Sequence, residues 1–299
     1  MDMEEITRID TIHQYNEYMG VETLHPLVSV VDMSKCSPRQ FHRINYGLYC
    51  IFLKNVKCGP LRYGINYYDY QNGTIVAVAP GQVFGVESDE LIQPKGWALV
   101  FHPDLLYGTE LGRTLKDYTF FSYDANEALH VSEKEREIIE QCFRNILTEL
   151  SREIDTHTNS LIARSIGMLL DYCMRFYDRQ FITRKKVNKD ILTRFESVLD
   201  DYLRSDQPRT DGLPTVAYCA DKVFLSPNYF GDLIKKETGK TAQEYIQLKV
   251  IDLAKLRLMD ASLSINEIAD QLGFKYSTHF TRLFKKWVGM SPSEYRMSC

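Results

Sequence analysis

Short runs of aromatic and β-branched residues dominate the first 125 residues of the chain. These runs are Tyr46–Lys54, Tyr63–Tyr70, Thr74–Ala79 and Ala98–Phe101. Asn72-Gly73 stands between the second and third runs, and an Asn-Gly pair in that position predicts a β-hairpin. Pro80-Gly81 then predicts a turn. Several short strands separated by such turn residues are typical of a β-sandwich or barrel.

The pattern changes to helical spacing near residue 130. Ser132 and Glu135 have the spacing of a capping box, in which the serine oxygen and the glutamate satisfy two backbone N–H groups. Apolar residues then recur every three or four positions over 138–150 and again over 161–177. Because only a short polar loop separates the two stripes, we expect an antiparallel helical pair over about 132–181.

Length and charge indicate two domains. A chain of 299 residues is long enough for two, and from Asp190 onward its pattern is helical to the end. We expect domains at 1–183 and 184–299, with a basic linker at about 182–190. The second domain has 19 Lys and Arg against 15 Asp and Glu, a net charge of +4, and the first has 17 against 25, a net charge of −8. This asymmetry suggests an anionic partner for the second domain.

Composition narrows the class of protein. Apolar residues make up 44% and charged residues 25%, as in soluble globular proteins. No stretch approaches the roughly 18 consecutive apolar residues of a membrane helix, and the acidic start Met1–Glu5 is unlike a signal peptide. We therefore expect a cytoplasmic protein without membrane partners. Seven cysteines with no Cys-x-x-Cys pair predict buried thiols rather than a disulfide framework or a zinc site.

The last eighty residues contain an internal repeat at an offset of 50. The matching pairs are Phe230 and Phe280, Leu233 and Leu283, Lys235-Lys236 and Lys285-Lys286, Gly239 and Gly289, and Glu244-Tyr245 and Glu294-Tyr295. Upstream, Ala220-Asp221 matches Ala269-Asp270 at an offset of 49. Each copy predicts a short helix, a turn and a second helix with a polar start. This order of elements is typical of a helix-turn-helix. Two copies are too few for a solenoid.

The residues around the repeat support this interpretation. Ser264 and Glu267 predict a capping box, and Gly273 predicts the left-handed turn residue of the second copy. One long helix, about Ala242 to Asp260, would join the copies and bury Tyr245, Ile246, Leu253 and Leu258. A second helix with a polar start can enter the major groove of DNA.

Residues 190–299 resemble the DNA-binding domain of the AraC/XylS family of bacterial transcription regulators. The stretches that carry the resemblance are 225–230, 235–240, 264–274, 280–286 and 289–296. It implies two helix-turn-helices, joined by a long helix, that enter successive major grooves on one face of the duplex. Twelve residues become candidate DNA contacts: Ser226, Asn228, Gly231, Asp232, Lys235, Lys236, Ser277, Thr278, Thr281, Arg282, Lys285 and Lys286.

Side-chain chemistry ranks these candidates. Arg282 is the first choice for a base contact, because arginine can donate two hydrogen bonds to guanine. Asn228 could pair with adenine by the same logic. The four lysines would meet phosphates or simply solvate their helices.

The sequence departs from the family pattern at several of these positions. Phe224 stands where many members have glycine in the first turn. Asp232 would repel phosphate and Gly231 has no side chain, so the first motif is expected to read bases weakly. Tyr276 replaces a polar residue at the second recognition helix, where we expect Ser277 to act as the cap.

The first half resembles, in architecture, the sensing and dimerisation half of the same family. The implied fold is α+β: an N-terminal cupin-like β-barrel with a two-helix appendage, followed by an all-α domain. The His-x-His pair of metal-binding cupins is absent between Tyr63 and Val86, and the seven histidines lack metal-ligand spacing. No phosphate loop or nucleophile elbow is present. We therefore expect no catalytic residues, metal or cofactor, and a structural role for His102 at a helix start.

The leading hypothesis is a sequence-specific, double-stranded-DNA-binding transcription regulator, more often an activator in this family. Its partners would be promoter DNA, a second copy in a homodimer, a small-molecule effector of the first domain, and RNA polymerase. The alternative is an effector-independent regulator whose first domain only dimerises or contacts another protein. A cupin-type enzyme fused to a DNA-binding domain is disfavoured by the missing metal set.

Overall fold

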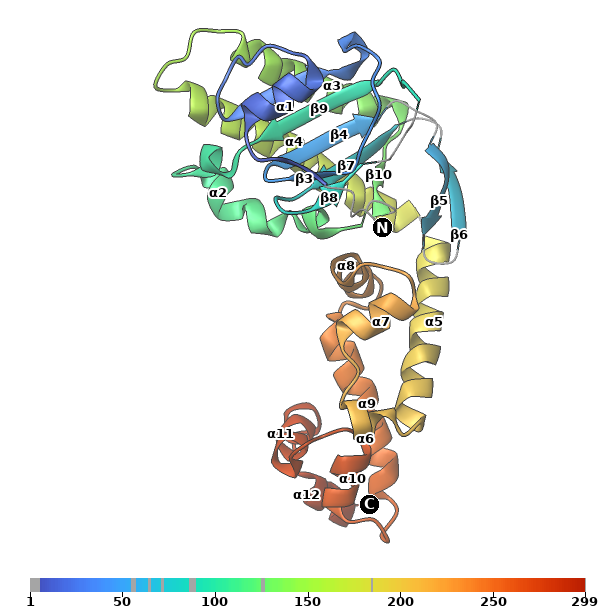
Figure 1. Cartoon of the computed structure of the whole chain (residues 1–299). Coiled ribbons are helices and arrows are strands. Elements are labelled where there is room, and N and C mark those ends of the chain that lie inside the picture. The colour runs from blue at the N-terminus through green and yellow to red at the C-terminus, as the bar shows by residue number, and fades with distance from the viewer. Residues whose placement is uncertain are drawn as a thin grey trace. The chain divides into compact units, whose positions relative to one another are not determined.

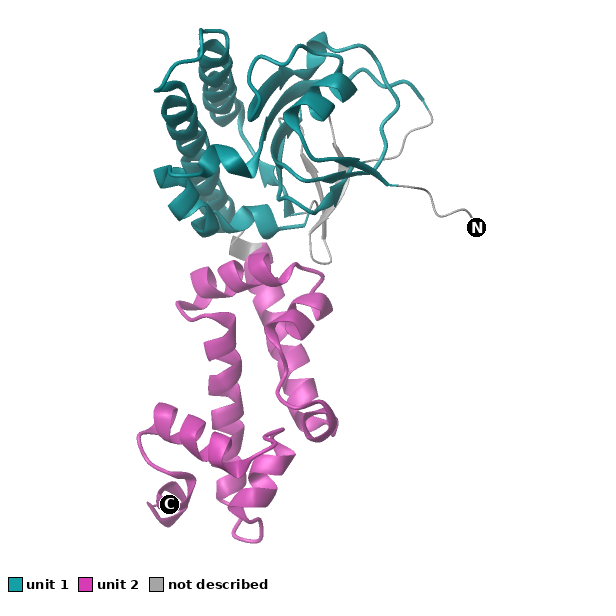
Figure 2. Cartoon of the chain, turned by 60° about the vertical axis from the view of Figure 1, so that its left-hand side comes forward, with its two compact units in different colours: residues 1–183 teal, residues 184–299 magenta. Residues whose placement is uncertain are grey.

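Residues 1–183 form one unit of the chain and residues 184–299 form the other (Figures 1 and 2). The computed structural model describes residues 6–54, 58–63, 66–70, 73–85, 90–124, 127–183 and 185–298. Within these residues, unit 1 combines sheets and helices and unit 2 is helical. The expected α+β class is therefore confirmed.

Unit 1 contains two open sheets and a separate hairpin. The antiparallel five-stranded sheet has the order β10-β7-β4-β9-β2, and the three-stranded sheet has the order β1-β3-β8. Their strands are β1 (Thr7–Ile9), β2 (Val28–Asp32), β3 (Ile44–Tyr46), β4 (Tyr49–Lys54), β7 (Thr74–Val78), β8 (Val83–Phe84), β9 (Gly96–Phe101) and β10 (Leu129–His130). Strands β5 (Cys58–Tyr63) and β6 (Asn66–Tyr70) form a separate two-stranded sheet.

The barrel expected from the family resemblance is not closed. Closure requires every strand to have two neighbours, whereas β10 and β2 each pair with one strand of the five-stranded sheet. One face of this sheet is covered by α1 (Ile12–Met19) and the three-stranded sheet, and the other by the helical pair (Figure 1). On the first face, Ile12 and Tyr15 of α1 join Cys50 and Phe52 in one buried core.

The other face of the sheet packs against the helical pair. Trp97 of β9 stacks on Phe143 of α3 (Glu133–Leu150), with ring centroids 5.9 Å apart. In β4, Ile51 and Leu53 alternate with Cys50 and Phe52, and all four side chains are buried. A strand that is buried on both faces has a continuous apolar sequence. For this reason residues 46–54 show little alternation of apolar and polar residues.

The structure differs from the sequence prediction at one strand and at one hairpin. The run 46–54 is divided between β3 and β4, and the chain changes sheet at Gly47, where a Cβ atom would overlap Asp10. The hairpin expected across Asn72-Gly73 does not form among the described strands, because β6 pairs with β5 while β7 pairs with β4 and β10. Asn72 itself lies outside the described residues.

The helical pair forms as expected. The Ser132 hydroxyl accepts from the Glu135 N–H at 3.4 Å and the Glu135 carboxylate accepts from the Ser132 N–H at 2.8 Å, which confirms the capping box of α3. Its partner α4 (Thr158–Thr183) packs along α3. Arg179 of α4 also binds the Glu135 carboxylate at 2.8 Å. His102 caps the short helix η2 (Pro103–Leu106) by accepting from the Asp104 N–H.

Unit 2 consists of eight helices among the residues described. They are α5 (Lys185–Arg204), α6 (Gln207–Asp211), α7 (Val216–Lys222), α8 (Pro227–Thr238), α9 (Ala242–Leu258), α10 (Ile265–Gln271), α11 (Ser277–Val288) and α12 (Pro292–Ser298). The stretch expected to be a linker is helical at 182–183 and at 185–190, because α4 and α5 end and begin there. Phe195 of α5 anchors the first half of unit 2 by packing edge-on against Phe230.

Candidate nucleic-acid interface

The repeat corresponds to two helix-turn-helices of the same construction. Helices α7 and α8 form the first, α10 and α11 form the second, and the second helices α8 and α11 are both twelve residues long. The two turns share a backbone hydrogen bond: Leu225 donates to Ala220 at 3.0 Å, and Phe274 donates to Ala269 at 2.9 Å. Both alanines are buried, so the paired helices can approach each other closely.

Helix α9 connects the two motifs and supplies their shared core. It contacts α8, α10, α11 and α12. Ile246 and Leu258 are buried as expected, whereas Tyr245 and Leu253 are half-buried. Val250, Ile251 and Ala254, which sequence reasoning did not single out, complete the buried face. The long helix therefore fixes both motifs on one support within unit 2.

The first motif presents a mixed surface. Asn228, Lys235 and Lys236 are exposed, and Gly231 and Asp232 are half-buried on α8. Ser226 is buried and is the N-cap of α8, where its hydroxyl accepts from the Tyr229 N–H at 3.3 Å. Ser226 thus has a structural role in this geometry, and the exposed polar side chains of α8 begin at Asn228.

The second motif presents a more cationic surface. Thr278, Arg282, Lys285 and Lys286 are exposed on α11, and Ser277 and Thr281 are half-buried. Within the described part of the chain, the Arg282 guanidinium has no hydrogen-bond or ion-pair partner. Thr281 donates to the Ser277 carbonyl at 3.0 Å, which directs its hydroxyl back to the helix.

The start of α11 differs from the expectation. The N-cap is Tyr276, not Ser277, and no side chain caps the helix because a tyrosine ring has no oxygen within reach of its own helix N-terminus. Ser277 is the first residue of the helix instead. The first N–H groups of α11 and the positive end of its dipole therefore remain accessible to an anion.

Sequence reasoning missed the other side chains at this helix start. Lys275 lies 5.9 Å from the Tyr276 ring centroid, and His279 packs edge-on against the same ring at 5.5 Å. All three residues are exposed. The signal was present in the sequence, since Lys275 lies in the turn directly before the polar start of the recognition helix.

Carboxylates in unit 2 serve its helix starts. Glu244, Glu267 and Glu294 each accept from the backbone N–H of the residue three positions earlier, and these hydrogen bonds lower their pKa values. Asp270 forms an ion pair with Arg209 at 3.1 Å. These acidic groups are thus engaged in holding the motifs together.

The described residues contain neither a cluster of metal ligands nor a membrane-spanning helix. No group of three or more His, Cys, Asp or Glu side chains is placed to hold a metal ion in the ranges that the structure describes. In the same ranges, no helix is long and apolar enough to cross a membrane.

Comparison with known proteins agrees with this geometry. Residues 219–298 match a family model described as a helix-turn-helix domain. The transcriptional regulator YijO of Escherichia coli is 27% identical over 225 residues, which cover 75% of this chain and 76% of that protein. The arabinose operon regulatory protein of E. coli is 33% identical over 84 residues, which cover 28% and 29%.

Other relatives are also covered only in part. The chain spans 14%, 58% and 21% of YtdP of Bacillus subtilis, LumQ of Photobacterium leiognathi and YesN of B. subtilis, less than two thirds of each. A solved C-terminal domain of the response regulator yesN from Fusobacterium nucleatum is 29% identical, with a TM-score of 0.30, and covers 34% of this chain and 96% of that one.

Unit 2 is therefore a helix-turn-helix domain of the DNA-binding class. More particularly, residues 219–298 form an AraC-type domain, and the relatives of the chain are transcriptional regulators of the AraC family.

Proposed function

We propose that this chain is a sequence-specific, double-stranded-DNA-binding transcription regulator, with unit 2 as its promoter-reading part. The observation that carries the proposal is the duplicated motif. On its second recognition helix, Arg282 is exposed, and among the described residues it has no partner and the helix start has no side-chain cap. In such motifs the second helix lies in the major groove and its N-terminal half contacts base edges.

The placement of side chains suggests their roles. Arg282 would donate two hydrogen bonds to a guanine edge, and Thr278 is exposed one turn earlier on the same helix. Asn228 is the corresponding base-reading candidate on α8. Exposed Lys235, Lys236, Lys285 and Lys286 would meet phosphates, which set position and affinity but not sequence. Gly231, Asp232, Ser277 and Thr281 would lie at the edges of the contact.

Unit 1 would dimerise and bind a small-molecule effector in the same proposal, and RNA polymerase would be a further partner of an activator. The helical pair supports the first role, because Ile138 and Leu161 are exposed apolar side chains on α3 and α4. A two-fold dimer would present paired half-sites to DNA. The similarity to the arabinose operon regulatory protein supports regulation of transcription rather than catalysis.

The effector-independent alternative is supported by the interior of unit 1. The residues between its two sheets, such as Tyr46, Phe52 and Val76, are buried and packed into one core. An effector would therefore bind outside that core. Ligand-dependent thermal stabilisation of unit 1 separates the two versions of the proposal.

Selection from random duplexes tests the DNA-binding proposal. The full chain is bound to the pool at about 150 mM salt, where non-specific phosphate binding is weak, and the recovered duplexes are sequenced. We expect two short sequence blocks about one helical turn apart, one for each motif. Recovery of no motif, together with equal affinity for all duplexes, would contradict sequence-specific binding.

The phosphate contacts have their own test. Lys285→Ala should weaken binding to every duplex and reduce the slope of log K against log salt by about one, because one fewer counterion is released. Binding is measured between about 50 and 200 mM salt. Lys134→Ala, which removes an exposed lysine of α3 in unit 1, is the matched control. An unchanged slope in Lys285→Ala would show that this lysine contacts no phosphate.

A further inference from the structure

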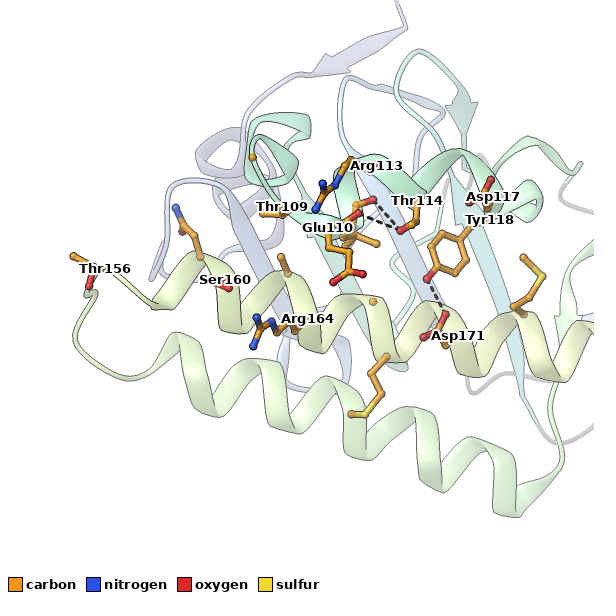
Figure 3. Close-up of a pocket in the computed structure, with 17 residues that line it drawn as sticks. Thr109, Glu110, Arg113, Thr114, Asp117, Tyr118, Thr156, Ser160, Arg164 and Asp171 are labelled. Carbon is orange, nitrogen blue, oxygen red and sulfur yellow. Dashed lines mark hydrogen bonds between the residues drawn. The ribbon is translucent and has the colours of Figure 1, made fainter.

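A groove of about 960 Å³ lies in unit 1 on the outside of the helical pair (Figure 3). One wall is formed by α2 (Glu110–Thr114) and the short helix η3 (Leu115–Asp117), and the other by α4. Its volume is within the range of sites for small molecules, about 300 to 1,000 Å³. Because its walls are mostly polar, it suits a polar ligand.

The floor of the groove is open at Gly167, in the middle of α4. A Cβ atom there would have only ordinary contact with Leu111, at 3.9 Å. Neither close packing nor a left-handed backbone therefore requires this glycine, although glycine weakens a helix interior relative to alanine. Its missing side chain instead keeps the space between the two walls free.

One end of the groove is cationic. Arg113 comes from α2 and Arg164 from α4, so two guanidinium groups reach this end from opposite walls (Figure 3). Among the residues that the structure describes, neither has a hydrogen-bond or ion-pair partner. A carboxylate bound between these two guanidinium groups would accept charge-assisted hydrogen bonds from both.

Glu110 limits which anion fits at this end. Its carboxylate points from α2 toward α4 (Figure 3), and no ion pair joins it to either arginine among the described residues. A phosphate group with two negative charges would be repelled by Glu110 more strongly than a single carboxylate. The ligand's anionic group is thus expected to carry one charge.

The other end of the groove is acidic. Asp171 of α4 accepts from the Tyr118 hydroxyl at 2.8 Å, and Asp117 lies on the same side of the groove (Figure 3). Burial and the bond to Asp171 raise the pKa of Tyr118, so the phenol stays a neutral hydrogen-bond donor. Asp171 follows Arg164 by seven helical residues, a rise of about 10 Å.

We propose that this groove binds a linear zwitterion of di- to tripeptide size, with its carboxylate between Arg113 and Arg164 and its ammonium group at Asp171. An extended tripeptide spans about 10 Å from end to end, since each residue adds about 3.3–3.6 Å. The inference rests on the proposed sensing role of unit 1 and identifies the class of effector. The hydroxyl group of Ser160 also lines the groove and can bond a peptide group.

Thermal stabilisation of the full chain tests this proposal. Pools of tripeptides with free termini, each peptide at about 1 mM, are added and the melting temperature is measured. We expect at least one pool to raise it, and a peptide from that pool to lose its effect when its N-terminus is acetylated or its C-terminus amidated. No stabilisation by any pool would overturn the proposal.

Variants then locate the site. Arg113→Gln and Arg164→Gln should each weaken the active peptide about tenfold or more, and should no longer distinguish it from its amide. Asp171→Asn should instead remove the distinction from the acetylated form while it keeps the Tyr118 bond. Arg175→Gln, an exposed arginine of α4 outside the groove, is the matched control. Equal affinity in Arg113→Gln/Arg164→Gln and the unaltered chain would place the ligand elsewhere.

The two proposals fail separately. These measurements use no DNA, so an absence of peptide binding leaves the selected duplex sequence unaffected. Loss of sequence-specific DNA binding, in turn, leaves the peptide-dependent melting temperature as it was.

Discussion

The two helix-turn-helices share their buried positions and differ on their exposed ones. Phe230 and Phe280 are both fully buried at matching positions. On the outer face, however, Asp232 of α8 corresponds to Arg282 of α11, at the same position of two twelve-residue helices. The two motifs therefore share the same buried scaffold. At this exposed position, however, α8 carries a negative charge and α11 a positive one.

The turns of the two motifs share a backbone conformation but differ in the residue that adopts it. Phe224 has φ +61° and the matching Gly273 has φ +87°, so both turns use a left-handed residue. Such a conformation is unfavourable for a residue with a Cβ atom. The first motif therefore holds strain that the second avoids, and the difference can be measured.

The largest effect is expected for Gly273→Ala. Its Cβ atom would lie 2.7 Å from the Pro208 carbonyl oxygen and 2.8 Å from the Gly212 carbonyl carbon, in addition to the left-handed backbone. We expect a loss of about 2–4 kcal/mol in the free energy of unfolding of unit 2. Urea unfolding followed by Trp287 fluorescence in a Trp97→Phe background measures it.

A matched control exists on α8. Gly231 lies in a helix interior, and a Cβ atom there would meet nothing within 4 Å. Gly231→Ala should therefore stabilise unit 2 by about 0.5–1 kcal/mol. A Gly273→Ala variant as stable as the unaltered chain would show that the two turns tolerate side chains equally.

The second-largest effect is expected on the affinity of unit 2 for DNA. Arg282→Ala should weaken binding to the selected duplex by about 1–3 kcal/mol and relax the preference at one base pair. Asp232→Ala should leave the selected sequence unchanged and slightly raise affinity for every duplex, because it removes a negative charge near phosphate. Competition against each single-base variant of the duplex measures both. An equal loss on all variants for Arg282→Ala would contradict a base contact.

The local features of unit 2 could be predicted from the sequence because they depend on neighbours three or four residues apart. The Ser264 and Glu267 capping box forms as expected, with hydrogen bonds of 3.1 and 2.7 Å. The polar positions of α11 are exposed for the same reason, since a helix repeats every 3.6 residues. The burial of Ser226, by contrast, follows from its capping contact with α8 and could not be predicted from its polar side chain.

The sheets of unit 1 could not be predicted in the same way. The division of residues 46–54 between two sheets depends on the approach of Asp10 to Gly47, which lie far apart in sequence. Strand β4 is buried on both faces, so its sequence does not indicate which side faces α1 and which faces α3. Pairing partners and barrel closure are long-range properties that a single pattern of residues leaves open.

The third effect is a gain in stability. Phe224→Gly should raise the free energy of unfolding of unit 2 by about 1 kcal/mol, since relief of a left-handed conformation exceeds the added freedom of glycine in the unfolded chain. The same Trp287 measurement applies. Phe224→Ala keeps the Cβ atom and removes the half-exposed ring, so it separates backbone strain from loss of ring contacts. A loss of stability in Phe224→Gly would show that these contacts outweigh the strain.

The smallest effect depends on pH and on one position that differs between the motifs. Glu267 of α10 corresponds to Tyr218 of α7, so only the second motif has a capping carboxylate. Hydrogen bonds from the Ser264 backbone N–H and hydroxyl lower the pKa of Glu267. A lowered folded-state pKa gives stability that is present above the unfolded pKa and is lost as the pH falls through the folded one.

Glu267→Gln should therefore be slightly less stable than the unaltered chain near about pH 7, and the difference should vanish near about pH 3. Glutamine keeps the capping geometry but not the charge at the helix N-terminus. The urea midpoints of both chains are compared across this range, so that Glu244 and Glu294, which titrate in both, cancel in the difference. A gap that stays constant with pH would mean that the charge of Glu267 does not stabilise the second motif.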